Sequence, residues 1–300
     1  MRRAFLCGFD KETGTDYEYR RGWIENRIRI LSSLFGIDIP AYVVMHNHIH
    51  MACELCPEQI EVLSDTEVVS RWRSLYQGPV IIQKWVKGEK LLDAELTMVD
   101  ECIAEYRRRL ASISWFMKCL NEPIARQANK EDNCTGHFWE GRFTSQPLPT
   151  EEALLTCMAY IDLNPIRANI AQTPETSDYT SIKERIKPCF QLDSAVEEQI
   201  ELGALRYFNV PLKPLSQFEG SVKNEHQKGI LFSLSDYLQL VDYTGRAIVP
   251  NKHGAIPINT PPILQRLCLD RKTWLDGAIN FEKHYRSRFL YQNSNFQDTG

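Results

Sequence analysis

The chain has 300 residues, of which 43% are hydrophobic and 25% are charged, and its formal net charge is −4. These values are typical of a globular protein with a sizeable core, and the length favours two domains over one. The negative charge excludes a protein that coats nucleic acid by general electrostatic attraction, so any contact with nucleic acid must be local.

The sequence contains no apolar run long enough for a membrane helix, and its start lacks the apolar segment of a secretory signal. We therefore expect a cytoplasmic protein that has no membrane partner. Of the nine cysteines, only Cys53 and Cys56 form a C-x-x-C pair. A zinc ribbon needs two such pairs, so the sequence predicts reduced thiols without an assigned chemical role.

The first elements are a short strand over residues 3–9 and a helix that Asp16 caps and that runs to Phe35, before Gly36. The helix carries basic residues that are candidates for a nucleic-acid patch, although such a run is more often a solvated helix face. These residues are Arg20, Arg21, Arg27 and Arg29.

The stretch YVVMHNHIHMACEL, residues 42–55, reads as a buried strand with a histidine at every second position. Side chains alternate between the faces of a strand, so His46, His48 and His50 are expected to share one face. Imidazole is a common metal ligand, but an H-x-H pair arises easily by chance, and the alternative is an exposed polar strand face.

Two helices are predicted next, a short one from Ser64 or Asp65 through Trp72 and a long amphipathic one over about 99–120. The long helix exposes one basic turn, Arg107, Arg108 and Arg109. The segment GHFWEGRFTSQPL reads as a loop entering a strand. A further helix starts at Thr150 and runs to about Asn164, where Pro165 ends or kinks it.

Tyr160 and Asn164 are four residues apart on that last helix and therefore project from the same face. Leu154, Met158 and Ile161 occupy another face, which leaves the tyrosine free to meet the histidines. The alternative is a tyrosine packed by its ring with its hydroxyl at the surface.

The pattern changes near residue 186, which we take as the boundary between residues 1–185 and a mostly helical accessory domain over 186–300. Helices are predicted to start at Asp236 and at Thr260-Pro261. Basic residues of this part are candidates for phosphate contacts, although interleaved acidic residues favour an ordinary solvated surface about equally. They are Lys223, Lys228, Arg246, Lys252, Arg266, Arg271 and Lys272.

Three motifs, MHNHIHM, HFWEGRF and YIDLNPIRANI, occur in an order and spacing that resemble the single-tyrosine HUH transposases, in the branch of bacterial REP-associated tyrosine transposases. The resemblance covers most of residues 1–185. It implies an α+β domain with a ferredoxin-like antiparallel sheet and helices, followed here by the small, mainly helical C-terminal domain.

The resemblance also implies residue roles. Tyr160 would be the nucleophile, and His48 and His50, with Asn164 as the third ligand, would bind Mg²⁺ or Mn²⁺. His46 departs from the family pattern. Six residues are candidates for DNA contacts: Arg107, Arg108, Arg109, His137, Trp139 and Arg142.

The expected function is a DNA transposase or strand transferase that nicks and rejoins single-stranded or hairpin DNA through a 5′-phosphotyrosine. Its partners would be repetitive palindromic elements, and the protein would be a monomer or homodimer. Relatives carry a further strand before RRAFLCG, so this sequence predicts a sheet that lacks one edge. The alternatives are an inactive protein that binds DNA hairpins and an unrelated H-x-H phosphoesterase.

Overall fold

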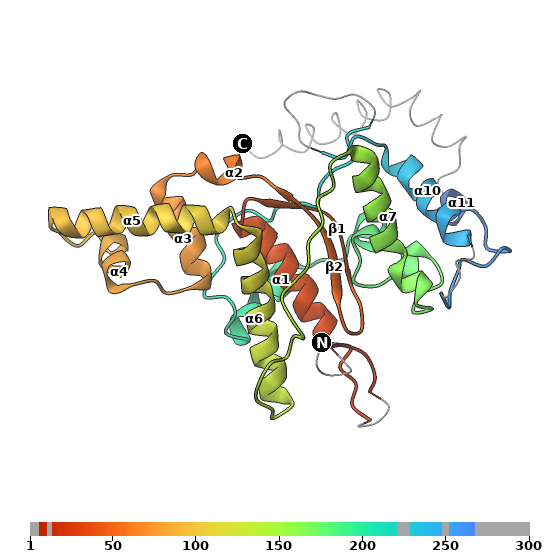
Figure 1. Cartoon of the computed structure of the whole chain (residues 1–300), viewed down its shortest axis with the longest axis horizontal. Coiled ribbons are helices and arrows are strands. Elements are labelled where there is room, and N and C mark those ends of the chain that lie inside the picture. Colours follow the sequence, from red (N-terminus) through yellow and green to blue (C-terminus); the bar gives the residue numbers. More distant parts are fainter. Residues whose placement is uncertain (1–5, 11–13, 221–228, 248–251, 268–300) are drawn as a thin grey trace, which may run out of the picture.

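The computed structural model of the chain describes residues 6–10, 14–220, 229–247 and 252–267 (Figure 1). Within these residues the chain is an α+β protein built around one antiparallel hairpin, β1 (Ile37–Val44) and β2 (Ile49–Leu55), with helices on both faces. The α+β class is confirmed. A ferredoxin-like sheet would need further strands, and the described residues form only these two.

The stretch 42–55 is a hairpin, so the prediction of one continuous strand was wrong. Val43 pairs with His50 and Val44 with Ile49, and the Met45 amide donates to the His48 carbonyl at 2.9 Å across the turn. The missed signal is Asn47, because asparagine is a frequent turn residue. The turn leaves His46 at the tip and keeps His48 and His50 on one side.

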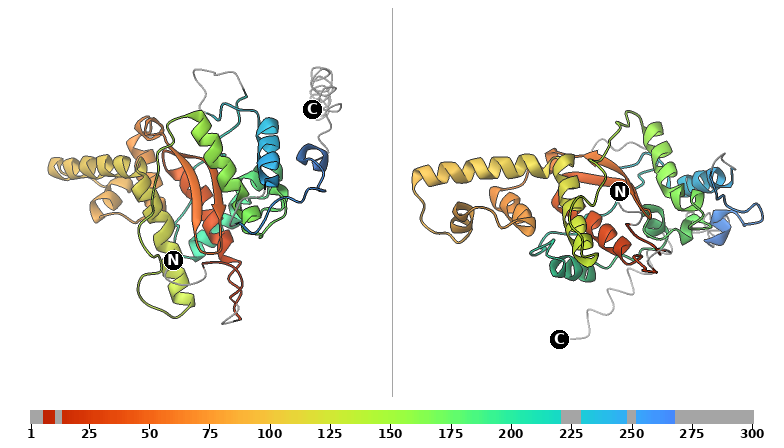
Figure 2. Two further views of the ribbon diagram at one scale, coloured as in Figure 1. Left: turned by 45° about the vertical axis from the view of Figure 1, so that its right-hand side comes forward. Right: turned by 60° about the horizontal axis from the view of Figure 1, so that its bottom comes forward.

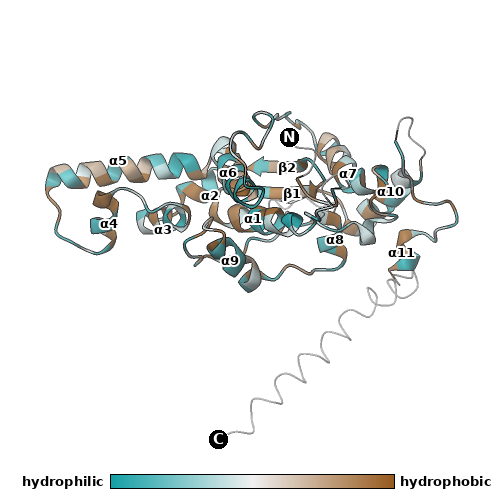
Figure 3. Ribbon diagram, turned by 90° about the horizontal axis from the view of Figure 1, so that it is seen from below, coloured by the Kyte–Doolittle hydropathy of each residue, from teal (hydrophilic) through white to brown (hydrophobic). Residues whose placement is uncertain are grey.

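The hairpin separates two hydrophobic cores because its side chains alternate between its faces. Tyr42 and Val44 belong to the first core, with α1 (Arg20–Leu34) and α6 (Ile113–Glu131). Val43 and Ala52 belong to the second core, with α7 (Glu151–Arg167) and α10 (Leu234–Arg246). Figure 3 shows β1 as a hydrophobic strand between these helices.

The N-terminal elements differ from the prediction at their starts. Helix α1 begins after Tyr19, because the Asp16 carboxylate instead accepts the Glu18 amide in the preceding turn. Its end before Phe35 agrees with the prediction. Of the predicted strand 3–9, residues 3–5 lie outside the described residues, and within 6–9 only Phe9 forms an isolated bridge, with Asp16.

Gly36, which lies between α1 and β1, must be a glycine for a steric reason. A Cβ at this position would lie 2.6 Å from the carbonyl oxygen of Cys56, and the Gly36 carbonyl accepts the Cys56 amide at 2.9 Å. Only glycine allows the two backbone segments to approach so closely.

Four helices form an arm that projects from the hairpin region (Figures 1 and 2). They are α2 (Glu58–Glu61), α3 (Asp65–Leu75), α4 (Val80–Val86) and α5 (Asp93–Leu110). Ser64 caps α3 as predicted, in a capping box with Glu67, although the helix continues beyond Trp72. The predicted helix 99–120 is wrong, because α5 ends at Leu110, and Ser112, in extended conformation, starts α6.

Helix α7 starts as predicted, since the Thr150 side chain accepts the Ala153 amide. Residues 136–149 contain no strand, which corrects the expectation of a loop entering one. Pro165 lies inside the helix, which continues to Arg167. Proline removes one helical hydrogen bond but leaves those of the following residues intact, so the helix does not end there.

The remaining helices pack directly on the first part of the chain. They are the 3-10 helix η1 (Pro174–Thr176), α8 (Ser181–Ile186), α9 (Leu192–Glu201), α10 and α11 (Ile263–Arg266). Gln199 of α9 donates to the Trp23 carbonyl of α1 at 3.2 Å, and Arg167 of α7 donates to the Thr244 carbonyl of α10 at 2.6 Å. No gap in the packing marks residue 186 in the part of the chain that the structure describes.

The arginines of α1 do not form a surface patch. Arg20 is 0% exposed and pairs with Glu131 and Asp132, at 3.0 and 2.6 Å. Arg27 is 2% exposed and donates to the carbonyls of Cys119 and Ala204. The prediction of a solvated or nucleic-acid-binding helix face was therefore wrong.

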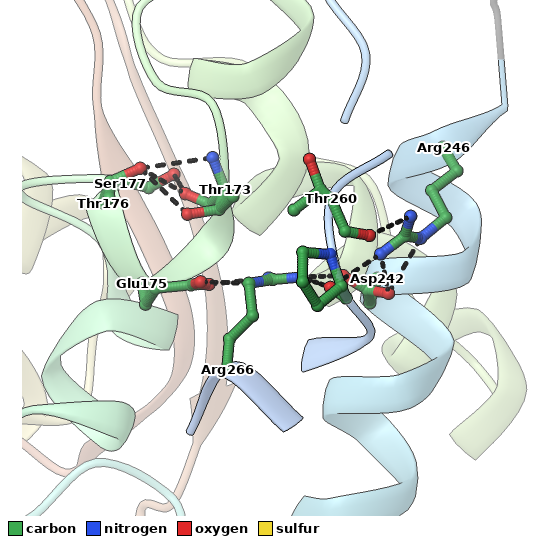
Figure 4. Close-up of polar contacts among 9 residues, drawn as sticks. Thr173, Glu175, Thr176, Ser177, Asp242, Arg246, Thr260 and Arg266 are labelled. Carbon is green, nitrogen blue, oxygen red and sulfur yellow. Dashed lines mark hydrogen bonds and ion pairs between the residues drawn. The ribbon is translucent and has the colours of Figure 1, made fainter. Parts of the chain in front are cut away.

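Two C-terminal arginines also make internal contacts (Figure 4). Arg266 pairs with Glu175 and with Asp242, and Arg246 pairs with Asp242 at 2.9 Å and donates to the Thr260 carbonyl. This network fastens α11 to α10 and η1. Four other predicted phosphate contacts lie outside the described residues: Lys223, Lys228, Arg271 and Lys272.

Candidate functional site

Two histidines lie side by side at the start of β2. His48 ends the turn and His50 is the second residue of the strand, so both side chains project toward the face that meets α7. Their ring centroids are 4.6 Å apart. Two imidazoles this close can bind one metal ion, since metal–nitrogen bonds are about 2 Å long.

Tyr160 of α7 contacts this pair within the same chain. Its ring centroid lies 5.7 Å from that of His50 at an interplanar angle of 76°, and 55% of its surface is exposed. The ring therefore contacts the histidine pair, as the helix spacing predicted, and it is not packed in a core as the alternative required. The rings of His48, His50 and Tyr160 form a continuous row.

The row opens into a cavity of about 1450 Å³ between β2, α6, α7 and the extended segment that precedes α7. Apolar lining residues include Met117, Leu154 and Trp139. Charged lining residues are Glu54, Glu140, Glu151 and Arg142. The wall thus carries more acidic than basic side chains, which suits a bound cation better than a whole DNA duplex.

The surroundings of both imidazoles favour their neutral forms. Burial, the neighbouring His48 and the charge of Lys252 lower the pKa of His50 to about 4, and burial is also the main reason why the pKa of His48 is lowered. The side-chain oxygen of Asn47 faces Nδ1 of His48, which favours a proton there and leaves Nε2 as the ligand atom. The pair therefore fits a divalent ion.

Asn164, the predicted third ligand, is placed differently. It is 8% exposed, and its amide nitrogen donates to the backbone carbonyl of Tyr160 at 2.9 Å. It is not among the residues that line the cavity. The structure therefore does not bring Asn164 to the cavity that His48 and His50 line.

His46 lies apart from the pair at the tip of the hairpin. Its carbonyl accepts the amides of Leu6 and Cys7, at 2.8 and 2.9 Å. A Cβ on Gly8, which has a φ of +92°, would come within 2.6 Å of the His46 ring. His46 thus packs against the N-terminal segment instead of pointing along the histidine row.

The three arginines at the end of α5 differ in their freedom to contact DNA. Arg107 donates to the carbonyls of Ile60 and Leu63, at 2.7 and 2.8 Å, and pairs with Asp65. The Arg109 guanidinium lies 4.2 Å from the centre of the Trp115 ring.

Arg108 is the most exposed of the three, with 64% of its side chain accessible, and it pairs with Glu105. These arginines are absent from the cavity lining.

The HFWEGRF segment supplies one side of the cavity. Phe138 is 2% exposed and belongs to the first core, so it is not a platform for base stacking. The Trp139 indole donates to the Asn121 carbonyl at 3.0 Å, which fastens the segment to α6. Arg142 is exposed and pairs with no carboxylate of the described residues, and His137 is exposed but does not line the cavity.

A second group of possible metal ligands lies at the other end of the hairpin. Ligand atoms of Asp38, Glu54 and Cys56 lie within 4.8 Å of one another. The Lys213 ammonium, however, lies 3.0 Å from Asp38 and already supplies a positive charge there. The described cysteines are free, in agreement with the predicted reduced thiols.

Asp162, for which no role was predicted, is fully buried and links α7 to its neighbours. The signal was present, since a carboxylate between Ile161 and Leu163 stands in an otherwise apolar helix segment. A buried carboxylate requires partners, so it marks a tertiary contact.

No protein-family model matches the chain, and no curated protein and no solved structure is similar to it. Among the described residues, none of the helices is both long and apolar enough to cross a membrane.

Proposed function

We propose that the chain is a metal-dependent DNA strand transferase that cuts and rejoins single-stranded or hairpin DNA through Tyr160. The observation that carries the proposal is the row formed by His48, His50 and Tyr160, which come from distant parts of the chain. The motif resemblance selects the same three residues. A hydroxyl nucleophile beside a metal-binding histidine pair is the minimum that this reaction needs.

In the proposed step, the Tyr160 oxygen attacks a backbone phosphorus and the bond from phosphorus to the 3′ oxygen breaks. The phenol loses its proton, and the departing 3′ oxygen gains one. The new phosphotyrosine ester retains the energy of the broken ester, so a 3′-hydroxyl can reverse the step without a nucleotide triphosphate. The exposure of Tyr160 supports access of a DNA strand to its hydroxyl.

The metal ion would supply the positive charge that the reaction needs at the phosphate. A phenol is a weak nucleophile at neutral pH because its ordinary pKa is about 10, and a phosphodiester repels anions. Bound Mg²⁺ or Mn²⁺ would supply positive charge and Lewis acidity at the phosphate. His48 and His50 would hold it through neutral imidazoles, and the acidic cavity wall would raise its local concentration.

The shape and charge of the cavity favour an unpaired strand as the substrate. A duplex brings two dense rows of phosphates, which Glu54, Glu140 and Glu151 would repel. A single strand can turn one phosphate toward the histidine pair and Arg142. We further propose that the hairpin and α7 are the counterparts of the central strands and the nucleophile helix of the ferredoxin-like HUH fold.

The test is incubation of the full chain with labelled single-stranded hairpin DNA and Mn²⁺, followed by denaturing electrophoresis. The wild-type chain should give a covalent adduct that Tyr160→Phe abolishes. Tyr243→Phe is the matched control, because Tyr243 is 79% exposed on α10, and it should leave the adduct unchanged.

Other results would select the alternatives. Tight hairpin binding by the wild-type chain without an adduct would indicate a DNA-binding protein without turnover. Metal-dependent hydrolysis that survives Tyr160→Phe would indicate a phosphoesterase that does not use the tyrosine.

A further inference from the structure

The helix that carries Tyr160 also carries a buried carboxylate, Asp162, which projects from a different side of the helix. Asp162 is 0% exposed and accepts two hydroxyl hydrogen bonds. Ser181 Oγ donates to Oδ1 at 2.8 Å, and the Tyr237 hydroxyl donates to Oδ2 at 2.6 Å. Burying a carboxylate is costly even when it is paired, and an apolar residue would fill the same space at lower cost.

The bond to Ser181 leads to the histidine hairpin. Ser181 Oγ accepts the backbone amide of Tyr42 in β1 at 3.1 Å, and the next residue, Val43, pairs with His50. The Ser181 hydroxyl therefore connects the nucleophile helix directly to the strand that pairs with the histidine strand, and the neighbouring Ile182 amide also bonds to Asp162 but makes no contact with Tyr42.

The backbone next to Ser181 is held in an unusual conformation. Tyr179 has a φ of +57°, which is uncommon for a residue with a side chain, and its carbonyl accepts the Val44 amide at 3.1 Å. Thr180 forms a bridge with Val43. These contacts fix the start of α8 along the outer edge of β1, so Ser181 is a rigid anchor for Asp162.

Apolar packing brings α7 and the hairpin together but does not fix their register. Met158 and Ile161 contact the second core, and hydrophobic contacts are not directional. Hydrogen bonds depend strongly on distance and angle. A carboxylate that is bonded to a fixed hydroxyl therefore sets the position of α7 along the hairpin.

We propose that Asp162 and Ser181 are positioning residues that hold the Tyr160 ring against His50. The catalytic part of this inference rests on the proposed function, whereas the geometric part does not. The hydrogen bond from Tyr237 serves as the control for the one from Ser181. It joins the same carboxylate to α10 and makes no link to the hairpin.

The test compares three single substitutions in the full chain. Ser181→Ala cuts the link to β1 and should lower kcat for adduct formation on the order of tenfold, with KM for DNA within about twofold, because a small misplacement of reacting groups slows chemistry more than binding. Tyr237→Phe should destabilise the fold similarly and leave kcat within about twofold. Asp162→Asn keeps an acceptor for Ser181 and should retain most of the rate.

A second readout does not depend on activity. The His50 ring protons lie beside the Tyr160 ring, so their NMR chemical shifts report the contact directly. These shifts should change in Ser181→Ala and stay as in the wild type in Tyr237→Phe. If Ser181→Ala does not fold, Ser181→Cys, which has a weaker donor, should show the same changes to a smaller degree.

Several outcomes would overturn the inference. The first is that Ser181→Ala has the same rate and the same His50 chemical shifts as the wild type. The second is that Tyr237→Phe loses as much of the rate as Ser181→Ala does. If the wild-type chain gives no adduct, the proposed function fails, and the His50 shifts alone decide the positioning role.

Discussion

His46, His48 and His50 have the same spacing in the sequence but different surroundings in the fold. The turn places His46 against Gly8, whereas His48 contacts His50, and His50 contacts Tyr160. The sequence predicted the pair correctly as neighbours on one face. The spacing alone could not separate His46 from them, because the position of the turn depends on how β1 and β2 pair; only the motif resemblance set His46 apart.

The three histidines allow a matched test of metal binding. His48→Ala and His50→Ala should each weaken Mn²⁺ binding by on the order of tenfold or more, because each removes a ligand. His46→Ala should leave the affinity within about twofold. Isothermal titration calorimetry of the full chain measures all three, and an equal loss in His46→Ala would show that the ion binds elsewhere.

Asp38 makes a pH-dependent contribution to stability. Burial favours its neutral form, but the Lys213 ammonium more than offsets this, so the pKa of Asp38 is lowered. A carboxyl group with a lowered folded-state pKa stabilises the fold above its unfolded value of about 4, and this contribution is lost as the pH falls through the folded pKa.

Asp38→Asn should therefore reduce the free energy of unfolding by about 1 to 2 kcal/mol at pH 7 and by less near pH 3. Urea unfolding at the two pH values measures the difference, with Asp100→Asn as the control for loss of an exposed carboxylate. An equal effect of Asp38→Asn at both pH values would contradict the ion pair with Lys213.

At the scale of the elements, local signals located two helix starts well and missed two others, since α1 begins after Tyr19 instead of Asp16 and Ser233 instead of Asp236 caps α10. Ser64 and Thr150 cap α3 and α7 as predicted, because a capping hydroxyl acts on amides only two or three residues away. The break between α5 and α6 was missed. The apolar spacing continues through Ser112, and the Leu110 carbonyl that would continue the helix is taken by the Gly36 amide, a contact between distant residues.

The end of α5 supports a prediction on two neighbouring arginines. Arg107→Ala should lower the free energy of unfolding by about 2 kcal/mol, because it removes the donor to the Leu63 carbonyl and one of two donors to the Ile60 carbonyl. Arg108→Ala should change it by less than about 0.5 kcal/mol, because its exposed pair with Glu105 contributes little. Thermal and urea unfolding of both variants test this, and equal losses would contradict it.

At the scale of the whole molecule, the two cores join parts of the chain that the sequence suggested as separate domains. Ala195, Leu205 and Leu215 belong to the first core, and Arg27 of α1 donates to the Ala204 carbonyl at 2.8 Å. The change of pattern near residue 186 reflects a change from helices to irregular segments. Periodicity alone cannot show that these segments cover the first core.

A chain ending at residue 186 should therefore lack a cooperative thermal transition, because it loses part of the first core and leaves the Arg27 guanidinium without one of its acceptors. A chain ending at residue 220 keeps these groups and should unfold cooperatively, at a lower temperature than the full chain. Circular dichroism measures both transitions. A sharp transition in the shorter chain would support the predicted independent domain of residues 1–185.

The candidate site shows the same division between local and long-range information. Spacing and motif resemblance selected His48, His50 and Tyr160, which the fold brings together. The link from Asp162 through Ser181 to Tyr42 joins three separate segments. The carboxylate of Asp162 between apolar neighbours signals that a tertiary contact exists, but no local pattern identifies Ser181 and Tyr42 as its partners.

β2 pairs with β1 along one edge, and its other edge has no partner strand among the described residues. The amides of the two edges should therefore differ in their rates of deuterium exchange. The amides of Tyr42 and Val44 point away from β2. The hydrogen bonds between the two strands are therefore formed by the alternate residues, among them Val43 with His50. By alternation, the amides of Met51 and Cys53 face the cavity, where no strand of the described residues pairs with them. These two protons should exchange within minutes, whereas those of His50 and Ala52 persist, and a DNA strand seated along this edge would slow only the fast pair.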